Sequence, residues 1–67
     1  MNTFMLIDHR DKNPVVIADN IFMKAALENA KEYIAKGGCP DHLFIREYDG
    51  DGYLNDIHSV NDLLIKA

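Results

Sequence analysis

The residue types best suited to chemistry are concentrated between Glu47 and His58. Asp49, Asp51 and Asn55 follow Glu47 at alternate positions, which is how the oxygen ligands of a calcium loop are spaced. A calcium loop, however, begins with Asp and completes its ligand shell with a bidentate Glu at the twelfth position, where this chain has His58. We therefore interpret the stretch as an acidic hairpin turn, with calcium binding as the alternative.

A second set of reactive side chains surrounds Cys39. Cys39 and His42 have the spacing of half a zinc site, and His9 and His58 could supply two further ligands. A second closely spaced pair is missing, so the simpler interpretation is a buried or half-buried thiol beside a surface imidazole. A cysteine nucleophile would need a base and an oxyanion donor within reach, which residue types alone cannot show. The sequence predicts no enzyme, no metal and no cofactor.

Composition limits the classes of protein further. A single cysteine excludes an internal disulfide, and its occurrence fits a reducing compartment. The longest apolar runs are far shorter than the roughly 20 residues that a membrane helix needs, and the first residues, Met1 to Ile7, lack the features of a signal peptide. We expect a cytoplasmic protein without a membrane partner.

Charge is distributed unevenly along the chain. Residues 1–38 contain five acidic and five basic side chains, whereas residues 39–67 contain six acidic and two basic ones, so the net charge of −4 lies in the C-terminal half. A nucleic-acid-binding domain normally carries a basic patch instead. The pattern argues against direct nucleic-acid binding and favours a partner with a basic surface.

The clearest predicted element is a helix over Asn20–Lys36. Its apolar residues recur every three or four positions, which is the period of a helix with one buried face. They are Phe22, Met23, Ala26, Leu27, Ala30, Tyr33 and Ile34. Asp19 or Asn20 could cap the first turn, and Gly37 could adopt the left-handed conformation that ends the last one.

Four short segments read as strands. Thr3–Asp8 and Asn13–Ala18 are apolar and separated by a polar turn, which predicts an antiparallel hairpin, and their continuous apolarity favours strands covered on both faces or central in the sheet. His42–Tyr48 alternates between two faces, and Tyr53–Ile57 follows a turn rich in Asp and Gly, so we expect a second hairpin.

A short helix is predicted at the end of the chain. Ser59 and Asp62 resemble a capping box, and Val60, Leu63 and Leu64 provide an apolar face. The whole chain, residues 1–67, is predicted to be a single α+β domain with the order ββαββ(α). The long helix would pack on one face of a three- or four-stranded, mostly antiparallel sheet.

The segment Ala26–Ile34, which reads ALENAKEYI, resembles the helix of the HicB-type antitoxin fold, in which a strand hairpin also precedes the helix. The resemblance covers about nine residues. The glycine-tyrosine strand of that family lies before its helix, whereas Gly52 and Tyr53 follow the helix here. In size, acidity and ββαβ pattern the chain is also similar to many small phage-encoded proteins that bind and inhibit host enzymes.

These observations predict a non-enzymatic protein-binding module that docks its acidic C-terminal half on a larger protein. A basic groove on a host nucleic-acid enzyme is a suitable target, which would make the protein an inhibitor encoded by a phage or a mobile element. The residues expected to contact the partner are Glu47, Tyr48, Asp49, Asp51, Tyr53 and Asp56. The alternative is an antitoxin-like homodimer with a structural or regulatory role, because a small domain with apolar strands gains by burying more surface.

Overall fold

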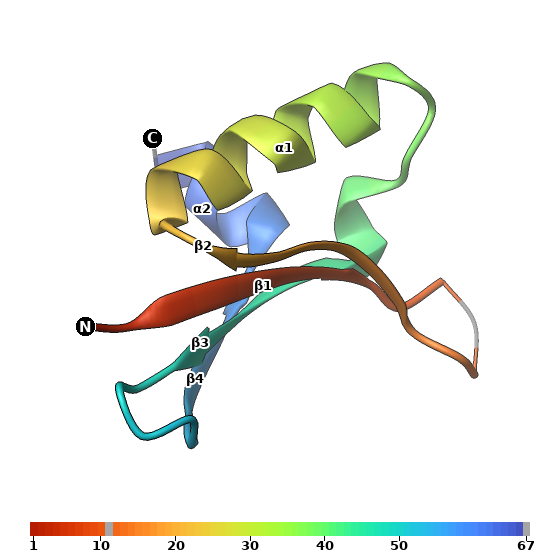
Figure 1. Ribbon diagram of the computed structural model, residues 1–67. Coiled ribbons are helices and arrows are strands. Elements are labelled where there is room, and N and C mark those ends of the chain that lie inside the picture. Colours follow the sequence, from red (N-terminus) through yellow and green to blue (C-terminus); the bar gives the residue numbers. More distant parts are fainter. Residues whose placement is uncertain (11, 67) are drawn as a thin grey trace.

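The computed structural model describes residues 1–10 and 12–66. Within these residues the chain forms a small α+β domain with a four-stranded antiparallel sheet and two α-helices (Figure 1). The elements in chain order are β1 (Thr3–Asp8), β2 (Val15–Ile21), α1 (Met23–Ala35), a 3₁₀ helix η1 (Pro40–His42), β3 (Leu43–Tyr48), β4 (Leu54–Ser59) and α2 (Val60–Lys66). In the part of the chain that the structure describes, no helix is long and apolar enough to cross a membrane.

The sheet has the strand order β2-β1-β3-β4, and every neighbouring pair is antiparallel. Both predicted hairpins are therefore present, and β1 is central. The expectation of a central position was wrong for the second strand, because β2 lies at one edge of the sheet and β4 at the other. Helix α1 links the edge strand β2 to β3, which pairs with the other side of β1.

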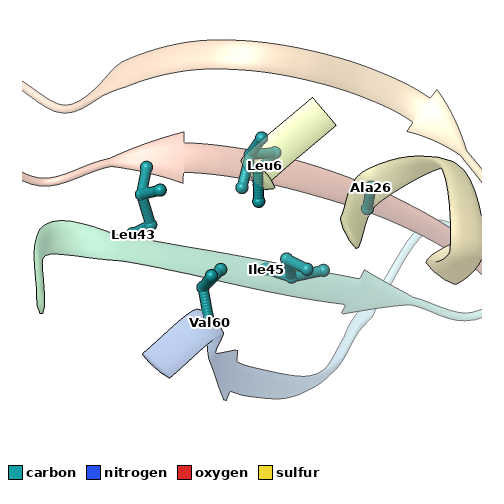
Figure 2. Packing of buried hydrophobic residues seen from close by; sticks show 6 residues of the cluster. Leu6, Ala26, Leu43, Ile45 and Val60 are labelled. Atoms are coloured by element: carbon teal, nitrogen blue, oxygen red, sulfur yellow. The ribbon is translucent and has the colours of Figure 1, made fainter. Parts of the chain in front are cut away.

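The hydrophobic core lies between one face of the sheet and the two helices, which both cover that face (Figure 1). Figure 2 shows side chains from β1, β3, α1 and α2 pointing toward one another. The fully buried cluster consists of Leu6, Ala26, Ala30, Leu43, Ile45 and Val60. Burying a Leu, Ile or Val side chain contributes about 1.5–3 kcal/mol, so the four large members of this cluster account for much of the stability of so small a domain.

Helix α1 is shorter than the sequence predicts. It begins at Met23, and Asp19 and Asn20, which were expected to cap it, belong to β2 instead. The position before the helix is Phe22, which has extended backbone angles and an exposed side chain. The prediction failed because Ile21 pairs with Phe4 in the sheet. This pairing keeps the backbone extended past the residues that resemble caps.

The C-terminal end of α1 agrees with the prediction. Gly37 has a φ of 108°, the left-handed conformation expected for it. The amide of Gly37 donates to the Ile34 carbonyl at 3.0 Å, and that of Gly38 donates to the Tyr33 carbonyl at 3.0 Å. These bonds satisfy carbonyl groups that the end of a helix otherwise leaves free.

The remaining boundaries shift by one to three residues. The second strand spans Val15–Ile21 rather than Asn13–Ala18, and the fourth spans Leu54–Ser59 rather than Tyr53–Ile57. Ser59 still pairs with Phe44, so the strand runs directly into α2. The short helix η1 was not predicted.

Candidate partner-binding site

The turn between β3 and β4 is organised by Asp49. Its carboxylate oxygen Oδ1 accepts hydrogen bonds from the amides of Asp51 and Tyr53, at 2.9 and 3.0 Å. Its backbone carbonyl also accepts from the amide of Gly52, whose φ of 89° suits glycine. Asp49 therefore holds the turn in shape, and half of its carboxylate is already used for this purpose.

Glu47 is likewise engaged within the domain. One of its carboxylate oxygens, Oε2, accepts hydrogen bonds from the side-chain amide nitrogens of Asn2 and Asn55. The other oxygen, Oε1, lies 2.9 Å from Nε2 of His58. These hydrogen bonds, of which the one from His58 has the largest effect, hold the pKa of Glu47 below its ordinary value. The side chain thus joins the N-terminus, β3 and β4, and it is poorly placed to contact a partner.

Asp56 lies on the exposed edge strand β4. Its Oδ1 accepts from the backbone amide of the next residue, Ile57, at 2.8 Å, and its Oδ2 is 3.9 Å from the ring of His58. The bond to Ile57 occupies a main-chain donor at the edge of the sheet, where free donors invite pairing with another strand. Most of the Asp56 side chain nevertheless remains accessible to solvent.

The face of the sheet opposite the helices carries apolar side chains. Cross-strand neighbours lie on the same face, and Tyr48 pairs with Leu54 while Arg46 pairs with Ile57. Leu54 and Ile57 are each about half exposed, and Tyr53 is 74% exposed. Three large apolar or aromatic residues are therefore accessible within five consecutive positions, next to the carboxylates of the turn and the edge strand.

The six residues predicted from the sequence thus have different roles. Asp51, Tyr53 and Asp56 are exposed on the turn and the edge strand β4. Tyr48 is half-buried on the open face of the sheet. The carboxylates of Glu47 and Asp49 are engaged in hydrogen bonds within the domain. Sequence reasoning missed Leu54 and Ile57. Their position in the last predicted strand, which has no following strand to cover it, was the signal that could have identified them.

We call the exposed set the hairpin surface. It consists of Asp51, Tyr53, Leu54, Asp56 and Ile57. Asp56 pairs with Glu47, and Ile57 pairs with Arg46, so the two side chains leave opposite faces of the same edge strand. A partner that covered this edge would meet a carboxylate on one side and an apolar side chain on the other.

The four residues considered as a zinc site do not all come together in the fold: Cys39 and His42 line one cavity, and His58 is not among its lining residues. His58 contacts Glu47 and Asp56, whereas the ring of His9 packs edge-on against Phe44. Among residues 1–10 and 12–66, no three His, Cys, Asp or Glu side chains are placed to hold a metal ion. Cys39, expected to be buried or half-buried, is exposed.

No family model, curated protein or solved structure matches the chain.

Proposed function

We propose that the protein is a non-catalytic binding module that docks its hairpin surface on a basic region of a larger protein. The observation that carries this proposal is the exposure of Tyr53, Leu54 and Ile57 beside the carboxylates of Asp51 and Asp56. Exposed apolar residues that occur singly need no explanation, but a group of them bordered by charge is typical of an interface.

The two kinds of side chain would act at different stages of binding. The carboxylates attract a positive partner during the diffusional approach and orient the two surfaces. The apolar and aromatic side chains then leave water at the centre of the contact, where Tyr is among the residues that contribute most. Full burial of a half-exposed Leu or Ile adds about 1 kcal/mol, so Leu54 and Ile57 stabilise the complex while Asp51 and Asp56 direct it.

The charge of the molecule indicates the kind of partner. The net charge of the protein is −4. Six of its eleven acidic residues lie in residues 39–67, which contain only two basic residues. A nucleic-acid enzyme presents a positive groove to its substrate, and an acidic hairpin of this kind could occupy it. Inhibition of such an enzyme is the form of this function that the charge distribution supports best.

A charge-matched pair of variants tests the role of the carboxylates. Asp51→Asn with Asp56→Asn removes two negative charges from the hairpin surface, and Glu28→Gln with Asp62→Asn removes two from exposed positions on the helices. We expect the first variant to recover much less of a specific partner from a cell lysate at low salt, while the second behaves like the wild type. Equal recovery by both variants and the wild type would refute the electrostatic part of the proposal.

Self-association is the second candidate function. It is favoured by the free edge of β4 and by a shallow depression of about 330 Å³ on the open face, lined by His9, Phe44, Arg46 and Ile57. Light scattering distinguishes the two candidates. A stable dimer at micromolar concentration would favour the homodimer, and a monomer that captures a partner would favour the binding module.

A further inference from the structure

A cavity of about 400 Å³ is lined by residues from the end of β1, the end of α1 and the segment that follows α1. The last turn of α1 lies at the opposite end of the molecule from the turn between β3 and β4 (Figure 1). The cavity is formed where β1 ends, where α1 turns into the loop before η1, and where β3 is about to begin. Its polar lining residues are Asp8, Arg10, Tyr33, Lys36, Cys39 and His42. Known ligand sites range from about 300 to 1,000 Å³, so this cavity suits a small molecule rather than a nucleotide.

Asp8 has an unusual position in this cavity. It is only 3% exposed, and its Oδ2 accepts a hydrogen bond from the hydroxyl of Tyr33 at 2.5 Å. The guanidinium of Arg10 approaches the same oxygen at 3.4 Å. The other oxygen, Oδ1, is buried without a hydrogen-bond partner among the residues that the structure describes.

An unsatisfied carboxylate oxygen in this environment is costly. Buried polar atoms almost always have a partner, and an orphan acceptor loses its hydration without compensation. Tyr33 does not reduce the cost at Oδ1, because its hydroxyl is committed to Oδ2. That bond raises the pKa of Tyr33, as expected for a phenol that donates to a carboxylate. Oδ1 is thus available to accept a hydrogen bond from a molecule outside the domain, either an ordered water or a ligand.

The other charges around the cavity restrict what that donor can be. Arg10 and Lys36 both line the cavity, and both side chains are largely exposed. A simple amine would be repelled by these two cations, and a simple anion would be repelled by Asp8. A molecule that carries both charges a few ångströms apart avoids both penalties.

We infer that this cavity binds a small zwitterion of the α-amino acid class. Its ammonium group donates to Oδ1 of Asp8, and its carboxylate lies between Arg10 and Lys36. Because Oδ1 is covered, one side chain must give way as the ligand enters. Arg10 can shift outward to admit the ligand and still face its carboxylate, since the side chain is exposed and its contact with Asp8 is a 3.4 Å approach to Oδ2.

Titration of the ¹⁵N-labelled protein tests the inference. The ligands are glycine and the larger L-amino acids, with methylammonium and acetate at the same ionic strength as the two half-ligands. We expect the amide signals of Arg10, Gly37, Gly38 and Cys39, which line the cavity, to shift with at least one amino acid. Each half-ligand should bind at least tenfold more weakly. The absence of shifts with every amino acid, or equal binding of a half-ligand, would overturn the inference.

Variants show whether the shifts come from the proposed contacts. Asp8→Asn keeps the shape of the side chain but removes the charge, whereas Arg10→Gln and Lys36→Gln change side chains that are largely exposed. Because Arg10 is the ion-pair partner of the buried Asp8, circular dichroism of Arg10→Gln must first show that the variant is folded. Arg10→Gln and Lys36→Gln should each weaken binding about tenfold, while Lys24→Gln, an exposed lysine outside the cavity, should leave it unchanged. If Asp8→Asn fails to fold, the two exposed variants decide alone. Equal binding by Arg10→Gln, Lys36→Gln and the wild type would contradict the assigned site.

Discussion

The aromatic ring of Tyr33 lies directly against Gly38, and this contact makes a sharp prediction. A Cβ atom added at Gly38 would lie 2.3 Å from Cδ2 and 2.5 Å from Cε2 of that ring. Carbon atoms in contact are normally about 3.5–4.0 Å apart. The ring would therefore have to move by roughly 1 Å or more in Gly38→Ala, away from the position in which its hydroxyl reaches Asp8.

We expect Gly38→Ala to destabilise the domain. Overpacking costs about 1–3 kcal/mol, which exceeds the gain of about 0.4–1 kcal/mol from a less flexible unfolded chain. In a domain of this size each kcal/mol changes the melting temperature by about 4–8 °C, so a net loss of about 1.3 kcal/mol lowers it by about 8 °C. Thermal unfolding followed by circular dichroism measures this change.

A double-mutant cycle separates the ring from other causes. In a Tyr33→Ala background the ring is gone, so Gly38→Ala should cost clearly less than in the wild type, whereas Tyr33→Phe keeps the ring and should keep the full cost. The contact of 2.9 Å with the Tyr33 carbonyl is present in every background and cancels from the comparison. The same cost of Gly38→Ala in all three backgrounds would refute the packing that we describe.

Three further perturbations test other parts of the fold. Leu6→Ala should remove about 2–5 kcal/mol from a fully buried site and leave the chain largely unfolded in denaturant titrations; a smaller loss would mean a looser core. The hydrogen bonds of Glu47, of which the one from His58 has the largest effect, lower the pKa of its carboxyl group in the folded protein. They therefore stabilise the fold fully at pH values above the ordinary carboxyl pKa, and this stabilisation is lost as the pH falls through the lowered pKa of the folded protein. Glu47→Gln should therefore flatten the acid side of the stability–pH curve, and an unchanged curve would contradict this. Asp56→Ala frees the edge amide of Ile57 and should increase self-association in light scattering, whereas Asp56→Asn, which keeps an acceptor oxygen, should do so less.

Local periodicity predicted the parts of the fold that depend on nearby residues. The alternation in β3 correctly separated Leu43 and Ile45 from Phe44 and Arg46, and the structure shows that the face with Leu43 and Ile45 is the buried one. The glycine that ends α1 was also identified, because left-handed backbone favours that residue type. Such signals need only the chemistry of a few consecutive residues.

Long-range pairing decided what the sequence could not show. Asp19 and Asn20 have the residue types of helix caps, yet the pairing of Ile21 with Phe4 kept them in a strand. Strand order is equally non-local, since β1 lies between two strands that are separated in the chain by a helix.

The candidate site shows the same limit. Glu47 looked like one acidic contact residue among several, and its engagement became visible only when the fold placed Asn2, 45 positions away, against its carboxylate. The apolar part of the hairpin surface was hidden for a related reason. Leu54 and Ile57 are exposed because, among the residues that the structure describes, no strand lies beyond β4 and no helix covers their face of the sheet.

The central claim is that the hairpin surface binds a partner, and one pair of variants tests it most directly. Ile57 and Val16 lie on opposite edge strands and are both 52% exposed, so truncating each to Ala removes the same kind of apolar surface at two places. Recovery of a specific basic partner from a lysate, measured with each tagged variant, should fall by up to about fivefold for Ile57→Ala, the equivalent of about 1 kcal/mol, and stay at the wild-type level for Val16→Ala. Equal recovery by the two variants would contradict the claim.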